Sequence, residues 1–348
     1  MPTLLRQRFR YVPYCELGEL PNVIVDGAPN EHTVLTLSHW PKSGTPSGLM
    51  RDTSAEIASV YLEAPNLHGN VDVVSNNHFD EDGLVALFTL LEPELASAQR
   101  DLLLDVATTG DFGTYRRRDA ARIVFTLSAH ADPKLSPLPA ELFQAADDDY
   151  QEHVAGLYRS TLELLPALLT RLDDYRRYWQ EEDEHLSRSE ELIEGGVVAI
   201  EEHPEIDLAV VRIPEDLARQ RDHRFAQPVS AVCHPFAIHN RTPRNRLLLV
   251  QGQAMELQYR YESWVQFASR RPLPRVDLAD FCARIETEEE AGHWVFDGVD
   301  EITPSLHLEG ASASSIPADR FIRDLCAYLK DAPPAWDPYD QPQETQLA

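Results

Sequence analysis

Short apolar runs alternate with amphipathic stretches through the first 130 residues, and this alternation restricts the fold more than any other feature. Alternating strands and helices imply a mostly parallel sheet with helices on both faces, which is an α/β fold. Ligands of such sheets collect at the carboxyl ends of the strands. The predicted strands are "PNVIVDG", "HTVLTLSHW", "VDVVSNN" and "RDLLLDVATTG", and the predicted helices are "TSAEIASVYLEA" (N-cap Thr53 or Ser54), "LVALFTLLEPEL" and "RRRDAARIVFTLSAH".

The length of 348 residues favours two lobes. We expect an N-terminal α/β domain over residues 1–140, which would bind metal, and a helical connector over residues 141–196. A smaller α/β domain over residues 197–330 would bind the substrate. Residues 331–348 are rich in Pro, Gln and Asp, which predicts a disordered tail.

The net charge of −27 excludes some classes of partner. A chain this acidic repels long nucleic acids, although local cations or metals still allow a small phosphorylated substrate. No apolar run is long enough to cross a membrane, and the N-terminus lacks the apolar core of a signal peptide. The four cysteines are widely scattered, with neither metal-ligand spacing nor a disulfide framework. We therefore expect a cytoplasmic protein without a membrane partner, whose oligomeric state, a homodimer included, stays open.

The segment "VVSNNHFDEDGL" carries the strongest chemical signal. In an extended chain His78, Asp80 and Asp82 would lie on one face, and this donor set suits Mn²⁺, with Mg²⁺ as the alternative. Gly83 would allow a tight turn into a helix whose N-terminus favours phosphate. A calcium EF-hand is excluded because Thr89 stands where the loop needs a bidentate Glu. The remaining alternative is an acidic turn in which Asp80 or Asp82 caps the helix.

Further candidate ligands follow the other predicted strands. His39 ends "VLTLSHWP", where a core histidine is the alternative, while Asp105 and Asp111 lie in "LLLDVATTGDFGTY", where Asp111 could instead cap a helix. Asp26 and His130 are weaker candidates of the same type.

The second half offers candidate anion-binding groups. Arg270 and Arg271 end a predicted strand and could clamp an anion, although a solvated pair is the alternative. His239 lies in a polar loop, and His307 lies in the small-residue loop "SLHLEGASASSIP". Motifs of serine hydrolases, P-loop enzymes, zincins and dinucleotide-binding proteins are absent from the sequence.

The segment "VVSNNHFDEDGLVALFTLL" resembles the first motif of the DHH phosphoesterase superfamily, in which a strand ends in an acidic run that binds Mn²⁺. "WVQFASRRPLPRVDLADFCARI" with "SLHLEGASASSIPADRFIRDL" is similar to the DHHA1 substrate domain. A literal Asp-His-His is absent, but "LTLSHWP" followed by "DTSAEIASVYL" resembles the segment around that motif. This segment precedes the first motif, so the resemblance implies a permuted order. The whole chain also resembles an uncharacterised bacterial family.

The resemblance implies a Mn²⁺-dependent phosphoesterase that hydrolyses a small phosphorylated compound or short nucleotide between two lobes. The alternatives are a binding protein without turnover and another metal-assisted hydrolase. The implied catalytic and metal residues are His78, Asp80, Asp82 and Asp111, with His39 and Asp105 as further metal ligands. The implied substrate-binding residues are Asn77, His239, Arg271 and His307.

Overall fold

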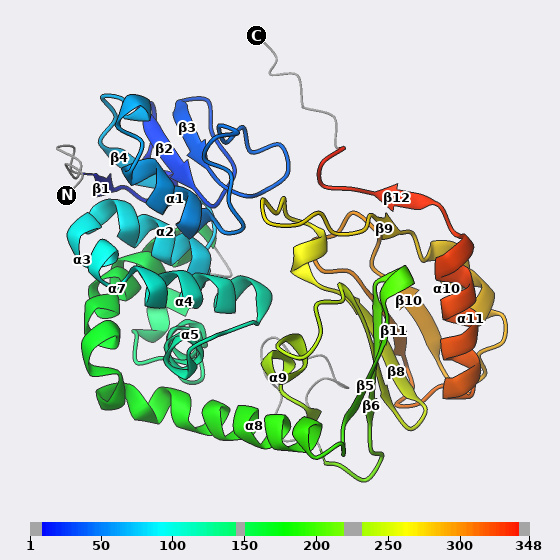
Figure 1. Cartoon of the computed structure of the whole chain (residues 1–348). Helices are drawn as coiled ribbons and strands as arrows, with labels where there is room; N and C mark the ends of the chain where they lie inside the picture. The colour runs from blue at the N-terminus through cyan, green and yellow to red at the C-terminus, as the bar shows by residue number, and fades with distance from the viewer. Residues whose placement is uncertain (1–8, 144–149, 219–231, 341–348) are drawn as a thin grey trace. The chain divides into compact units, whose positions relative to one another are not determined.

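The computed structural model describes residues 9–143, 150–218 and 232–340. The chain forms two compact units (Figure 1). Unit 1 comprises Met1–Asp183 and Gln266–Arg270, and unit 2 comprises Glu184–Val265 and Arg271–Ala348.

Unit 1 contains a four-stranded sheet in which every neighbouring pair is parallel. The strand order is β1-β4-β2-β3, so β2 lies between β4 and β3. A wholly parallel sheet confirms the expected α/β class, because crossover segments bring each strand back in the same direction. The strands are β1 (Arg10–Tyr11), β2 (Asn22–Val25), β3 (Thr33–Leu37) and β4 (Val73–Ser75).

The helices of unit 1 bury mostly apolar faces. Thr53 caps α1 as predicted, since its side chain accepts a hydrogen bond from the Glu56 backbone N–H. The α-helices are α1 (Ser54–Leu62), α2 (Glu81–Leu91), α3 (Pro93–Ala98), α4 (Arg100–Phe112), α5 (Arg118–Ala131) and α7 (Tyr150–Arg171). Short 3-10 helices are η1 (Tyr14–Glu16), η2 (Pro65–Leu67) and η3 (Leu172–Tyr175), and α8 (Arg176–Glu194) begins in unit 1 and ends in unit 2.

The prediction of a strand at "RDLLLDVATTG" is wrong, because this segment forms α4. Three consecutive leucines suggested a strand. The buried residues, however, include Leu103, Val106 and Ala107, whose spacing is that of one helix face. Gly113 ends the helix with a φ of +64°, a conformation that glycine adopts at little cost.

Unit 2 is built on a six-stranded mixed sheet of order β10-β11-β8-β7-β6-β5. The β6–β7 pair is parallel and the other pairs are antiparallel. The strands are β5 (Ala199–His203), β6 (Leu208–Ile213), β7 (Arg246–Gln251), β8 (Ala254–Tyr259), β10 (His293–Phe296) and β11 (Ser305–Glu309). The helices are η4 (Pro204–Ile206), α9 (Pro235–His239), η6 (Tyr261–Ser263), α10 (Ala279–Glu286) and α11 (Ala318–Asp331).

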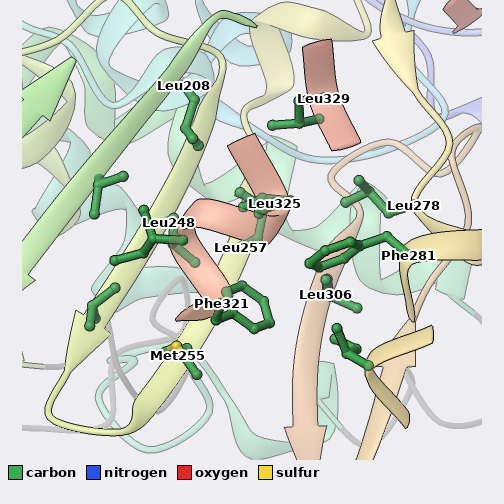
Figure 2. Packing of buried hydrophobic residues seen from close by; sticks show 14 of the residues in the cluster. Leu208, Leu248, Met255, Leu257, Leu278, Phe281, Leu306, Phe321, Leu325 and Leu329 are labelled. Carbon is green, nitrogen blue, oxygen red and sulfur yellow. The ribbon is translucent and has the colours of Figure 1, made fainter. Parts of the chain in front are cut away.

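The main core of unit 2 lies between this sheet and the helices α10 and α11 (Figure 2). Phe281 of α10 and Phe321 of α11 meet edge to face, with ring centroids 5.4 Å apart. They pack in the same cluster as Leu257 of β8 and Leu306 of β11. A second hydrophobic cluster contains other residues of the same sheet, such as Val211, together with the loop residue Cys233. Unit 2 is therefore also an α/β unit.

Part of the predicted disordered tail is ordered. Residues 334–336 form β12 (Pro334–Trp336), which pairs antiparallel with β9 (Arg275–Val276). Trp336 anchors this segment: its ring stacks on Trp264 and lies 4.9 Å from the guanidinium of Arg275. The composition of this segment predicted disorder because composition carries no information about the contacts that Trp336 makes. Residues 341–348 lie outside the described part of the chain.

Within the described ranges, no helix is long and apolar enough to cross a membrane.

The core of unit 2 can be tested with one substitution at two positions. Leu257 is fully buried, whereas Leu273 is 48% exposed. Leu257→Ala should lower the free energy of unfolding by about 2–5 kcal/mol, because it removes packed methyl groups and leaves a cavity. Leu273→Ala should change it by less than about 0.5 kcal/mol. Urea unfolding followed by circular dichroism measures both, and equal changes would contradict this description of the core.

Candidate metal centre

Three neighbouring parallel strands end at one edge of the unit 1 sheet, and each is followed by a polar residue. Asp26 follows β2, His39 follows β3 by two residues, and His78 follows β4 by three. Because β2 lies between the other two strands, Asp26 lies between the two imidazoles. Its Oδ1 is 3.6 Å from His39 Nε2, and its Oδ2 is 3.4 Å from His78 Nε2.

The backbone around Asp26 is unusual. Its φ is +45°, a left-handed conformation that few residues other than glycine adopt and that aspartate tolerates better than most. At the next residue, Gly27, a Cβ atom would lie only 2.3 Å from Asn77 Oδ1. The Asp-Gly pair therefore suits both the backbone conformation at Asp26 and the close approach of the Asn77 side chain at Gly27.

The start of α2 supplies two more carboxylates. Asp80 is the N-cap: its Oδ1 accepts the Gly83 N–H at 2.7 Å, and its Oδ2 lies 2.7 Å from His78 Nε2. Asp82 is already inside the helix, so the expectation that one extended face carries all three side chains is wrong beyond Asp80. The helix nevertheless turns Asp82 toward the same cluster, with its Oδ2 3.9 Å from His39 Nε2.

The tight turn predicted at Gly83 is absent, because Gly83 lies within α2. Gly83 matters instead because it has no side chain. A Cβ atom at this position would lie 2.3 Å from Asn76 Nδ2 and 2.5 Å from the Tyr158 hydroxyl. Tyr158 donates a hydrogen bond to the His78 carbonyl oxygen. The missing Cβ thus allows α7 and β4 to approach the N-terminus of α2 closely.

The N-terminus of α1 holds the inner side of the cluster. The backbone N–H groups of Ser54 and Ala55 donate to the two oxygens of Asp82 at 2.6 and 2.8 Å. The Ser54 hydroxyl donates to Asp26 Oδ1 at 2.8 Å. These bonds fix both carboxylates, and each oxygen keeps a second lone pair for another partner.

Asp111, near the end of α4, completes the group. Its Oδ2 is 3.4 Å from His39 Nε2, and only 4% of its side chain is exposed. Although its segment was predicted to be a strand, Asp111 still reaches the cluster because α4 ends beside the sheet edge.

Four carboxylates therefore gather around two histidines, and no lysine or arginine of the described residues pairs with them. The side chains of Asp26, His39, Asp82 and Asp111 are almost fully buried, whereas those of His78 and Asp80 are 21% and 29% exposed. The cluster has a closed inner side and an outer side that solvent reaches.

Crowding changes the acidity of the carboxyl groups. Burial and the charges of the neighbouring carboxylates raise the pKa of Asp82 and Asp111 well above the usual range. Burial acts on Asp26 in the same direction, but the adjacent His78 outweighs it and lowers the Asp26 pKa to about 2. Without a cation, Asp82 and Asp111 therefore hold protons more tightly than ordinary aspartates do.

The two histidines differ. Burial lowers the pKa of His78, but the charge of Asp80 and the nearby Asp26 outweigh it, so the pKa lies well above the usual value. Burial lowers the pKa of His39. The Nδ1 of His39 lies 2.6 Å from the Asp52 carbonyl oxygen, which only accepts hydrogen bonds. The Nδ1 of neutral His39 must therefore carry the proton, so its Nε2 presents a lone pair to the carboxylates.

These features fit a divalent cation. Two groups of three residues could each hold an ion: one is Asp26, His39 and Asp82, and the other is Asp26, His78 and Asp80. Within the described ranges, one oxygen each of Asp26 and Asp111 is buried without a hydrogen-bond partner. Oxygen and imidazole donors without a thiolate suit a hard or borderline ion such as Mn²⁺ or Mg²⁺.

Comparison with protein families gives one match. A family model described as a family of unknown function, DUF6687, matches residues 7–340. The chain belongs to the DUF6687 family. Searches of curated proteins and of solved structures found no match.

Several predicted residues of this DUF6687 member lie elsewhere. Asp105 is on α4, and its carboxylate accepts the backbone N–H groups of Arg116 and Arg117 just before α5. His130 is on α5, where its Nδ1 contacts the Thr126 carbonyl oxygen. Asp105 thus holds the segment before α5, and His130 is a core histidine.

The predicted substrate-binding residues have local partners. Asn77 Oδ1, beside the cluster, accepts the Ala28 N–H. In unit 2, Arg271 pairs with Asp337 and Asp340, and His307 Nδ1 contacts the Ser305 hydroxyl.

His239 ends α9 of unit 2. Arg270 and Arg271 do not end a strand as predicted, because β8 ends earlier, at Tyr259. The guanidinium of Arg270 lies over the Phe267 ring of its own segment.

Asp26 is a weaker candidate ligand by sequence but a central residue of the cluster in the structure. It directly follows the apolar run "NVIV", so the rule that selected His39 applies to it equally. An aspartate that does not alternate with other ligand types gave little signal, and its importance arises from the central place of β2 in the sheet.

Metal binding should release protons. Because Asp82, Asp111 and His78 all hold protons more tightly than usual, a cation that occupies the cluster must displace them. The affinity for Mn²⁺ should therefore rise with pH. Calorimetric titration of Mn²⁺ in buffers of different ionisation enthalpy measures the released protons. An affinity independent of pH, with no proton release, would contradict the proposed ligand set.

Proposed function

We propose that this protein is a metal-dependent phosphoesterase that uses one or two Mn²⁺ ions, with Mg²⁺ as the alternative, on a small phosphorylated compound or short nucleotide. One observation carries the proposal: Asp26 belongs to both groups of three residues that could hold a cation. A carboxylate shared between two positions could bridge a pair of neighbouring ions. When bound, such ions neutralise phosphoryl oxygens and make water a stronger nucleophile at neutral pH.

The burial of the cluster supports separate roles for its two sides. His39, Asp82 and Asp111 lie on the closed side, where they would hold the inner cation. His78 and Asp80 lie on the open side, where they would hold the outer cation close to an arriving substrate. Asp26 would orient both positions.

The resemblance to the DHH phosphoesterases supports the same activity. It implies that "LTLSHWP" contributes to the site although it precedes the first motif. His39, which belongs to that segment, lies within 4 Å of Asp82 of the first motif. This proximity supports a permuted order, in which spatial neighbours are kept and the chain connects them differently.

The acidity of the chain bears on the substrate. A net charge of −27 disfavours long polyanions, whereas two divalent ions would supply local positive charge for one phosphate group. The roles proposed for Asn77, His239, Arg271 and His307 in substrate binding rest on the sequence pattern and on the resemblance.

Asp26→Asn tests the function most directly. Asparagine tolerates the left-handed backbone, and its carbonyl oxygen can still accept the Ser54 hydroxyl, so the fold should persist. The Mn²⁺ content measured by mass spectrometry should fall. Hydrolysis should fall by more than about 100-fold. Loss of a residue that only supports a metal ligand costs up to about 100-fold, and Asp26 would be a ligand itself. Asp101→Asn, at an exposed position on α4, is the matched control.

Turnover should be measured with Mn²⁺ on nitrophenyl phosphates, short dinucleotides and nucleoside phosphates, with amide and carboxyl ester substrates alongside. Hydrolysis of the ester or amide compounds alone would indicate another metal-assisted hydrolase. Mn²⁺ binding without turnover of any compound would indicate a binding protein. An Asp26→Asn protein with unchanged turnover of a proven substrate would refute the proposed centre.

A further inference from the structure

A five-residue segment distant in sequence packs beside the metal-ligand cluster. Gln266–Arg270, here called the clamp segment, belongs to unit 1 although its chain neighbours on both sides belong to unit 2. The backbone N–H of Gln266 donates to the His39 carbonyl oxygen at 2.9 Å. The clamp segment is therefore bonded directly to the main chain of a candidate metal ligand.

Asp52 holds the middle of the clamp segment. Its Oδ1 accepts the backbone N–H groups of Ala268 and Ser269, each at 2.8 Å, and its Oδ2 accepts the Ser269 hydroxyl. One carboxylate thus receives three hydrogen bonds from two consecutive residues. Hydrogen bonds to a carboxylate are about twice as strong as neutral ones, so Asp52 is a strong polar anchor of the segment.

The same residue also orients His39. The carbonyl oxygen of Asp52 accepts a hydrogen bond from His39 Nδ1–H, with Nδ1 and the oxygen 2.6 Å apart, and this bond directs Nε2 toward the cluster. Asp52 immediately precedes Thr53, the N-cap of α1, and the next two N–H groups hold Asp82. The side chain of Asp52 therefore binds the clamp segment while its main chain positions a ligand.

An apolar contact joins the clamp segment to a further ligand. The Phe267 ring packs against Phe112, with ring centroids 5.0 Å apart, and Phe112 directly follows Asp111. Phe112 also lies beside His39, with ring centroids 6.1 Å apart. The clamp segment thus contacts the main chain of His39 and the residue next to Asp111, which are two of the three inner candidate ligands.

We propose that Asp52 is a positioning residue that couples docking of the clamp segment to cation binding. This inference rests on the proposed metal centre. A docked clamp segment holds the Asp52 main chain where it orients His39, and a bound cation holds His39 where its Nδ1 stabilises that main chain. Because such coupling is reciprocal, Mn²⁺ should tighten the clamp segment as much as the clamp segment tightens Mn²⁺ binding.

Asp52→Ala tests the coupling, with two readouts. The first is hydrogen exchange of the Ala268 and Ser269 amides, which should be faster in the variant and, in the wild type, slower once Mn²⁺ is added. The second is the Mn²⁺ dissociation constant, which should rise about 10–100-fold, as for other residues that orient metal ligands. Asp132→Ala is the matched control: it removes an aspartate that accepts one backbone N–H in an exposed turn of unit 1.

Asp52→Asn and Asp52→Ala together separate a positioning role from an effect on general stability. The asparagine amide can accept the two backbone N–H groups and donate to the Ser269 hydroxyl, so Asp52→Asn should restore most of the Mn²⁺ affinity that Asp52→Ala loses. A purely structural role would lower the melting temperature of Asp52→Ala and leave the Mn²⁺ affinity of the folded protein unchanged. Should Asp52→Ala not fold, Ser269→Ala removes only the hydroxyl bond and should give a smaller loss of affinity in the same direction.

The outcomes separate this inference from the proposed function. If the wild type binds no Mn²⁺, the metal centre itself fails, and the coupling fails with it. If the wild type binds Mn²⁺ and Asp52→Ala binds it equally well while its clamp amides exchange faster, the metal centre stands and the coupling is overturned. Slower exchange with Mn²⁺ in the wild type, together with weaker binding in Asp52→Ala and recovery in Asp52→Asn, supports it.

Discussion

The contact of Asp26 with two imidazoles is the interaction on which the rest of the candidate site depends. It places one buried carboxylate between His39 and His78, and each histidine in turn brings further carboxylates within 4 Å. Asp26 can lie between the two imidazoles only because β2 is flanked on both sides by parallel strands that end at the same edge. The sheet order therefore determines which ligands can be shared, and the residues that follow each strand determine their chemistry.

The helices around this edge also serve the cluster. Both α1 and α2 direct their N-termini toward it, so backbone N–H groups at the positive end of a helix contact Asp82 and Asp80. The sequence analysis offered a capped helix as the alternative to a metal ligand for these aspartates. The structure shows that the two roles are compatible, because a carboxylate that accepts one hydrogen bond per oxygen retains lone pairs for a cation.

Local patterns predicted the elements of unit 1 well where period and capping agreed, as for α1 with its Thr53 cap and for the strands on either side of Asp26. They failed at α4, where three consecutive leucines resembled a strand, and at Trp336, whose anchoring contacts are distant in sequence. The candidate site shows the same division. Spacing selected His78, Asp80 and Asp82, although Asp82 reaches the cluster from within α2 and not from an extended segment. The central role of Asp26 depends on strand order, which no local window contains.

The electrostatic energies indicate that the charges of the clustered carboxylates must be offset by cations or protons. A charge placed near a helix terminus gains about 0.3–1 kcal/mol, and up to about 2 kcal/mol when partly buried. Burying a carboxylate costs several kcal/mol for each ion. Two helix N-termini and one protonated imidazole therefore cannot offset four carboxylates of which three are almost fully buried, and the raised pKa values of Asp82 and Asp111 express this deficit as retained protons. Such a deficit lowers the stability of the folded protein unless protons or a bound cation remove it.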